Sequence, residues 1–242
     1  LPPDGLAILN MDDEYQVSYK IKNNVKVLWV GIENENADLY ASNIKASKDG
    51  MSFDIYFKKE NIKHTFNTIL LGNSNIYNIL EAVAFSRYVM NMSFEEIKLG
   101  VKRIKPITHR LEIKNMGDRT IIDDAYNSNP IGSKMALDVL KLMDGLKVVV
   151  TPGMIELGDE QYNLNKKFGE YISEVADYVI LVGKKQTEPI LDGLKEKKYK
   201  NDKIFLINDV KEAFDIIDKI KVKNKHSYIL LENDLPDIFN EK

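Results

Sequence analysis

The 242-residue chain is longer than most single domains, so its length predicts two domains. Its 34 basic and 37 acidic residues give a net charge of -3 and are spread along the chain, which excludes an extended basic surface for a nucleic-acid partner. The lack of cysteine excludes disulfides, thiolate nucleophiles and cysteine-ligated zinc and fits a reducing, cytoplasmic compartment, and every apolar run is too short to span a membrane.

The first 71 residues contain apolar and alternating stretches that predict several short strands. These strands are expected at residues 6–9, 25–30, 39–46, 51–58 and 64–71. Polar turns such as Lys48-Asp49-Gly50 join them, which predicts an antiparallel sheet. The chain opens at Leu1, without an initiator Met, in an L-P-P-D-G turn that leads directly into an apolar strand. We therefore expect further residues of the same domain upstream.

The period of the apolar residues becomes helical after Gly72. A helix is predicted over residues 73–91, and a second one starts at Ser93, whose hydroxyl forms a capping box with Glu96. Pro106 follows in the stretch 104–108, which is the best candidate for a linker.

From His109 onwards the chain alternates regularly between strand and helix patterns. Strands are predicted at residues 110–115, 119–124, 147–152, 178–183, 203–208 and 227–232, with helices at about 130–143, 160–177, 187–197 and 209–221. A tight N-M-G-D turn makes the first two strands an antiparallel hairpin, whereas helical crossovers make the later pairs parallel. The sequence therefore predicts a doubly wound α/β sheet with one antiparallel strand. No G-x-G-x-x-G dinucleotide fingerprint follows its first crossover strand.

The most informative segment is D-D-A-Y-N-S-N-P, which starts at Asp123 between a predicted strand and a predicted helix. Asn129 before Pro130 is a typical helix start, with Asn as the N-cap. That structural role does not explain Asp123, Asp124 and Asn127, because Asp and Asn are disfavoured in strands. Open α/β sheets bind ligands at this edge, so we expect a site here, with a purely structural role as the alternative.

Two other polar motifs precede this segment. Asn75 and Asn78 are three residues apart and share one face of the first helical turn, where an amide that donates and accepts suits the N6 and N7 edge of adenine. Helix capping is the alternative for Asn75. Arg110 follows the linker and carries a fork of donors that suits a nucleotide phosphate; its alternative is a surface pair with Glu112.

The loop T-P-G-M-I-E-L-G-D-E, which follows the predicted strand 147–152, faces the same sheet edge. Glu156 in this loop is predicted to contact substrate, or else to complement the dipole of the next helix. The three histidines are far apart and lack metal-ligand spacing, so no metal site is predicted; they are His64, His109 and His226.

The motifs N-M-D-D, G-N-S-N-I-Y-N, R-L-E, D-D-A-Y-N-S-N-P and M-I-E-L-G, in this order, resemble the Mur ligases over nearly the whole chain. D-D-A-Y-N-S-N-P is the most specific and looks like the branch that adds D-alanyl-D-alanine to a UDP-N-acetylmuramoyl tripeptide, since sister enzymes carry a D-Y-A-H type sequence there. The resemblance implies the tail of a central ATPase domain with an antiparallel subsheet in residues 1–106. It implies a C-terminal Rossmann-like domain in residues 107–242.

In such ligases of peptidoglycan precursor synthesis, ATP phosphorylates a carboxylate of the UDP-linked muramoyl peptide, and an incoming amine attacks the acyl phosphate. The resemblance places the family's adenine-binding Asn pair at Asn75 and Asn78. It places the catalytic Arg that reaches the ATP phosphates at Arg110, and the ribose-binding Asp at Asp124. The cofactors implied are ATP and Mg²⁺, and we expect a monomeric cytoplasmic ligase.

At the positions that the family uses for substrate binding, this chain differs from its relatives. Asn127 takes the place of a His in the sister enzymes and is assigned to substrate binding together with Glu156. Where the family usually has G-D-M, this chain has P-G-M at residues 152–154, which lacks the acidic residue. Many relatives carry a basic K-G-S-R type segment where this chain has the acidic L-E-N-D-L-P-D, residues 231–237, which is expected to weaken binding of a carboxylate-bearing acceptor. The acceptor is therefore D-alanyl-D-alanine or another amine.

The family's G-T-x-G-K-T phosphate loop and its Mg²⁺ ligands, a Glu, a His and a modified Lys, have no counterpart in the sequence and are expected upstream. Nothing then cradles the ATP phosphates, so we expect this chain alone not to catalyse ligation. Two alternatives stay open: a Mur-type ligase that adds or amidates a different group, and a non-catalytic α/β binding module. Amidating relatives with a four-cysteine zinc site are disfavoured by the lack of cysteine.

Overall fold

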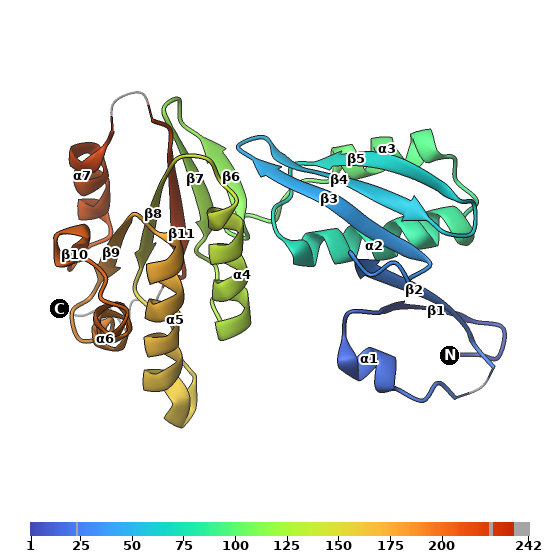
Figure 1. Cartoon of the computed structure of the whole chain (residues 1–242), viewed down its shortest axis with the longest axis horizontal. Helices are drawn as coiled ribbons and strands as arrows, with labels where there is room; N and C mark the ends of the chain where they lie inside the picture. Colours follow the sequence, from blue (N-terminus) through green and yellow to red (C-terminus); the bar gives the residue numbers. More distant parts are fainter. Residues whose placement is uncertain (23, 223–224, 235–242) are drawn as a thin grey trace. The chain divides into compact units, whose positions relative to one another are not determined.

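The computed structural model describes residues 1–22, 24–222 and 225–234. The chain forms two compact units, Leu1–Lys105 and Pro106–Lys242, and each has its own sheet and core (Figure 1). Within the described ranges, no helix has the length and apolar character that crossing a membrane requires.

The first unit contains a five-stranded mixed sheet with the strand order β1-β2-β3-β4-β5. Its strands are β1 Leu6–Asn10, β2 Lys26–Ile32, β3 Leu39–Ser47, β4 Gly50–Phe57 and β5 Ile62–Thr68. The antiparallel pairing expected for this region is confirmed for β3, β4 and β5. It is wrong for β2 and β3, which pair in parallel, as do β1 and β2.

A short loop explains the parallel pairing of β2 with β3. Glu33 adopts a left-handed φ of 60° and donates its N–H to the Ala41 carbonyl at 2.8 Å. Asp38 accepts a hydrogen bond from the Trp29 N–H at 2.8 Å, so the chain returns alongside β2 before β3 begins. Parallel strands usually need a longer crossover, which is why polar turns alone gave the wrong direction here.

Three helices accompany this sheet: α1 Glu14–Ser18, α2 Asn73–Tyr88 and α3 Phe94–Arg103. α2 packs on β1, β2 and β3, and α3 packs on β5. The short α1 was not predicted; Asp13 of the N-M-D-D motif caps it by accepting from the N–H groups of Tyr15 and Gln16. The capping box of Ser93 and Glu96 at the start of α3 is confirmed.

The second unit contains a six-stranded sheet with the order β10-β9-β8-β11-β7-β6 (Figure 1). Its strands are β6 Glu112–Asn115, β7 Arg119–Asp124, β8 Leu146–Thr151, β9 Tyr178–Val182, β10 Ile204–Ile207 and β11 Ser227–Glu232. Its helices are α4 Pro130–Lys141, α5 Gln161–Val175, α6 Glu188–Glu196 and α7 Lys211–Ile220, with single 3-10 turns at Gly158–Glu160 and Asn201–Lys203. Only β6 runs antiparallel to its neighbour, which confirms the predicted doubly wound sheet with one antiparallel strand.

Both faces of this sheet are covered by apolar side chains. Val148, Val150 and Ile229 on one face pack with Ala213 and Ile217 of α7. Residues one position along each strand point to the opposite face and are equally buried. This burial on both faces explains why β8 and β11 read as continuous apolar runs rather than as alternating ones.

Candidate functional site

Three neighbouring strands of the second sheet end side by side in polar residues. β7 ends at Asp124, β11 at Glu232 and β8 at Thr151, and the parallel register places Glu232 opposite Asp124. Asn233 extends this junction, since its N–H donates to the Asp124 carbonyl at 3.2 Å and its side chain donates to the Gly153 carbonyl at 2.6 Å. The loops after β7 and β8 are therefore both fastened to the end of β11.

Asp123 takes part in an ion cluster with the neighbouring hairpin strand. Its Oδ2 lies 2.9 Å from His109 Nδ1 and accepts a hydrogen bond from Lys114, whose Nζ also lies 3.3 Å from Glu112. Burial alone would raise the pKa of Asp123, but the hydrogen bonds from Lys114 and His109 hold that pKa below its ordinary value.

This cluster also resembles a cation site in its composition, because His109, Glu112 and Asp123 offer ligand atoms within 4.8 Å of one another. However, Lys114 already compensates the two carboxylates. Mg²⁺ prefers oxygen ligands over a ring nitrogen. The donor set therefore does not fit Mg²⁺ and is explained by its ion pairs.

Asp124 is half-buried beside the start of the hairpin. Its Oδ1 accepts a hydrogen bond from the Leu111 N–H at 3.0 Å. Burial raises the pKa of Asp124, and the Leu111 N–H and the charge of Arg110 oppose that rise. His109 and Leu111 both adopt left-handed φ values, 60° and 48°, so the chain loops out on either side of Arg110. The predicted strand start at residue 110 is therefore wrong, and β6 begins at Glu112.

Arg110 is exposed, and its guanidinium stacks over an aromatic ring of the next loop. Its Cζ lies 4.7 Å from the centre of the Tyr126 ring. The alternative pairing of Arg110 with Glu112 is wrong, because the Glu112 carboxylate lies 3.3 Å from Lys114 Nζ instead. The planar fork of Arg110 thus remains available for an anionic ligand.

The loop after β8 is held by a buried side chain of α5. Asn165, only 1% exposed, accepts a hydrogen bond from the Met154 N–H at 2.8 Å and donates to the Met154 carbonyl at 2.9 Å. Gly153 has a φ of 82°, and a Cβ there would lie 2.9 Å from Asn165 Oδ1, so this turn needs glycine. Glu156 is exposed and lies outside the first turn of α5, which removes its helix-dipole alternative.

A hollow of about 450 Å³ lies between the two loops and the end of β11. It is lined by His109, Ala125, Tyr126, Asn127, Ile155, Glu156, Asn233 and Asp234. Of the predicted site residues, Asn127 and Glu156 line it directly. Arg110 adjoins it through Tyr126, and Asp124 adjoins it through Asn233. The polar strand ends therefore form one concave site.

Asn75 and Asn78 belong to the other unit, in the first two turns of α2. Asn78 is exposed, while Asn75 is half-buried and donates from Nδ2 to the Leu71 carbonyl at 2.7 Å. Capping does not explain Asn75, because the N-cap position is Gly72 and no side chain caps the helix. The Asn78 amide lies on the helix surface, where it is free to meet a ligand.

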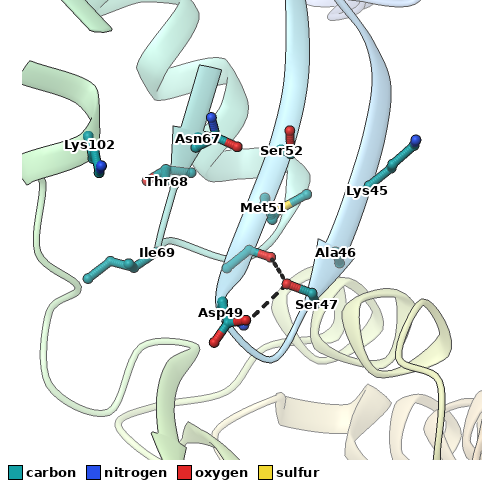
Figure 2. Close-up of a pocket in the computed structure, with 11 residues that line it drawn as sticks. Lys45, Ala46, Ser47, Asp49, Met51, Ser52, Asn67, Thr68, Ile69 and Lys102 are labelled. Atoms are coloured by element: carbon teal, nitrogen blue, oxygen red, sulfur yellow. Dashed lines mark hydrogen bonds between the residues drawn. The ribbon is translucent and has the colours of Figure 1, made fainter. Parts of the chain in front are cut away.

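The first unit has a hollow of about 290 Å³ at the tip of the β3-β4 hairpin, shown in Figure 2. Ser47 closes this tip by accepting from the Asp49 N–H at 3.2 Å and donating to the Gly50 carbonyl at 3.4 Å. Lys102 approaches it from α3 (Figure 2). None of the predicted site residues lines this hollow, and its polar groups are engaged in the hairpin, so we do not assign it a function.

Several residues of the site were missed from sequence. Tyr126 and Asn165 gave no signal, because an exposed Tyr in a loop and an Asn in a helix are common. A signal was present for Glu232, which ends an apolar strand, and for Asn233 and Asp234, which follow it. The parallel direction of that strand brings these residues to the same sheet edge as Asp124. They were considered only for their charge, as part of the segment 231–237, of which residues 235–237 lie outside the described residues.

Comparisons with known proteins agree with this architecture. Residues 1–86 match the Mur ligase middle domain, and residues 109–231 match the Mur ligase glutamate ligase domain. The chain is 30% identical over 239 residues to a UDP-N-acetylmuramoyl-tripeptide--D-alanyl-D-alanine ligase of Buchnera aphidicola, covering 96% of this chain and 50% of that protein. It is also 30% identical over 227 residues to a UDP-N-acetylmuramate--L-alanine ligase of Dictyoglomus turgidum, covering 88% of this chain and 47% of that protein.

Among solved structures, the MurF ligase from Thermotoga maritima in complex with ADP superposes with a TM-score of 0.76 at 19% identity, covering 96% of this chain and 50% of that one. That likeness shows a shared fold. The chain thus spans about half the length of the curated relatives it matches. The two family matches together cover both units of the chain, and the second alone covers half of its residues. This protein chain therefore belongs to the Mur ligase family.

Proposed function

We propose that the chain is part of a cytoplasmic ATP-dependent amide ligase that adds D-alanyl-D-alanine to a UDP-N-acetylmuramoyl tripeptide. In this reaction the γ-phosphoryl group moves from ATP to a carboxylate of the muramoyl peptide, and ADP leaves. The amine of the acceptor then attacks the acyl phosphate carbon, an amide bond forms, and phosphate leaves. We assign residues 1–106 to the central ATP-binding domain and residues 107–242 to the C-terminal domain.

One observation supports this proposal more than any other. The ends of β7, β11 and β8 enclose a hollow that Asn127 and Glu156 line, with Arg110 and Asp124 beside it. We assign Arg110 to the ATP phosphates, since its exposed fork suits them, and Asp124 to the ribose. Asn75 and Asn78 are assigned to the adenine, and Asn127 and Glu156 to the peptide or amine substrate.

The reaction also needs a phosphate loop and Mg²⁺ ligands, and we assign both to a part of the protein outside this sequence. The chain alone is then expected to release no ADP above background when given ATP, Mg²⁺, the UDP-linked tripeptide and D-alanyl-D-alanine. A form that also carries the phosphate loop should release ADP, and only when both the tripeptide and the acceptor are present. ADP release by the 242-residue chain itself would contradict the assignment of the phosphate loop and the Mg²⁺ ligands to another part of the protein.

The charge of the hollow favours a second candidate, a Mur-type ligase with another amine acceptor. Glu156 and Asp234 are both exposed in its lining, and no Lys or Arg is among the described residues that line it. Two carboxylates attract the ammonium end of an acceptor and repel its carboxylate end. Comparing ADP release with D-alanyl-D-alanine, L-alanine and meso-diaminopimelate as acceptors separates the two candidates. A clear preference for D-alanyl-D-alanine would reject the second.

A further inference from the structure

Glu232 is the most deeply buried carboxyl group beside the site, and no role has been assigned to it above. It is 1% exposed at the end of β11, between β7 and β8. Its Oε1 accepts a hydrogen bond from the Ser128 Oγ at 2.6 Å, and Ser128 itself is only 8% exposed. Glu232 therefore reaches from the sheet into the loop that carries Asn127.

The second carboxyl oxygen of Glu232 defines its protonation state. Among the described residues, Oε2 has no hydrogen-bond partner, and an ionised oxygen without a partner is costly in a buried place. Burial, followed by the negative charge of Asp124, raises the pKa of Glu232 to about 8. The register of β11 with β7 places Glu232 opposite Asp124, so the two carboxyl groups are neighbours. Burial beside another carboxyl group therefore favours a neutral Glu232.

The surrounding charges support the same assignment. On the β7 side, Asp123 adds negative charge near Asp124 and Arg110 adds positive charge. On the β8 side, the residues beside the end of β11 are Val150 and Thr151, which are uncharged. On α4, which packs on β11, Lys134 is exposed and pairs with Asp138 at 3.2 Å, and Lys141 is exposed in the last turn. Among the described residues, the groups that act on the Glu232 carboxyl are Asp124 and Ser128, and neither is a cation.

We propose that Glu232 is a positioning residue, whose neutral, buried carboxyl group accepts a hydrogen bond from Ser128 and so holds the loop after β7 in its ligand-binding form. When Glu232 ionises, its carboxylate and that of Asp124, which lies opposite it in the sheet, repel each other in a buried place. The loop should then loosen as the pH rises through 8. That this loop binds ATP rests on the proposed function, whereas its fastening by Glu232 does not.

The test measures amide hydrogen exchange in residues 124–130 of the whole 242-residue chain between pH 7 and pH 9, expressed as protection factors. At pH 9 about one tenth of Glu232 is neutral, so protection of the loop should fall roughly tenfold from its value at pH 7. Glu232→Gln keeps an acceptor for Ser128 without ionising, so its loop should stay protected at both pH values. Glu196→Gln, an exposed carboxyl in the same unit, is the matched control and should behave like the unmodified chain.

Ser128→Ala provides a second variant, because it removes the partner of Oε1 without changing charge. Its loop should be less protected already at pH 7. Equal protection at both pH values in the unmodified chain, or an equal loss in Glu232→Gln, would overturn the proposal.

Binding of a fluorescent ATP analogue, measured in a form of the protein that also carries the phosphate loop, reports on the ligand separately. We expect its dissociation constant to rise about tenfold from pH 7 to pH 9 in that form and to stay constant when it carries Glu232→Gln. Absence of binding at every pH would count against the proposed ATP site, while the exchange data would still decide the role of Glu232.

Discussion

Replacing Arg110 by Ala tests the assignment of the phosphate-binding residue. In the folded chain the side chain is exposed, and its guanidinium stacks on Tyr126 with Cζ 4.7 Å from the ring centre. An exposed contact of this kind is worth about 0.5–1 kcal/mol, so the free energy of unfolding should fall by no more than about 1 kcal/mol. A charge contact that acts on the transferring phosphoryl group is worth about 3–4 kcal/mol in the transition state. The substitution should therefore lower kcat by about 10²- to 10³-fold.

The assay measures ADP release by a form of the protein that includes the phosphate loop, together with urea unfolding of each variant. Since the contact strengthens in the transition state, kcat should fall much more than KM rises. Arg110→Lys keeps the charge but not the fork and should recover part of the rate. Arg103→Ala, an exposed Arg on α3, is the matched control and should leave kcat unchanged. A kcat within about threefold of the unmodified value would refute the assignment.

Two further predictions concern the folded chain alone. Asn165→Ala should lower the free energy of unfolding by about 2–4 kcal/mol in urea titrations, because it strands the buried Met154 N–H; the exposed Asn163→Ala on the same helix should change it by less than about 0.5 kcal/mol. Hydrogen bonds from Asn43 and Thr65 lower the pKa of Asp54 to about 2, below its unfolded value of 3.8, so its stabilising contribution is present above about pH 4 and lost as the pH falls towards 2. Between pH 6 and pH 3 the free energy of unfolding should therefore fall by about 1–2 kcal/mol less in Asp54→Asn than in the unmodified chain. An equal fall in the two proteins would show that Asp54 contributes nothing.

The elements of the second unit were predictable because their signals are local. Apolar runs of strand length alternate with helical periods, and caps such as Asn129, which accepts from the N–H groups of Ile131 and Gly132, mark where helices begin. The N-M-G-D turn predicted the antiparallel hairpin of β6 and β7, in which Asn115 lies opposite Thr120. In the first unit, the direction of β3 depended on the conformation of Glu33 and on the bond between Asp38 and Trp29, which no periodic pattern encodes.

The site was predictable only as far as strand ends were recognised. Asp124 ends β7, and Asn127 and Glu156 lie in the loops after β7 and β8, which the strand order brings to one edge of the sheet. The strand order itself, with β11 between β7 and β8, could not be predicted from the periodicity of the sequence. For that reason the sequence showed Glu232 and Asn233 only as part of an acidic segment. In the structure they lie in the middle of the site and bind the loops after β7 and β8.

The central place of β11 also affects how the protein is made. β11 is the last strand of the described chain, yet it lies between β7 and β8, so the ribosome must synthesise β9 and β10 before the middle of the sheet exists. Until residues 227–232 emerge, β7 and β8 present unpaired inner edges, which are prone to pair with other chains. A premature stop before Ser227 would thus remove the centre of the sheet rather than its margin. Such a product should aggregate or be degraded instead of surviving as a shortened domain.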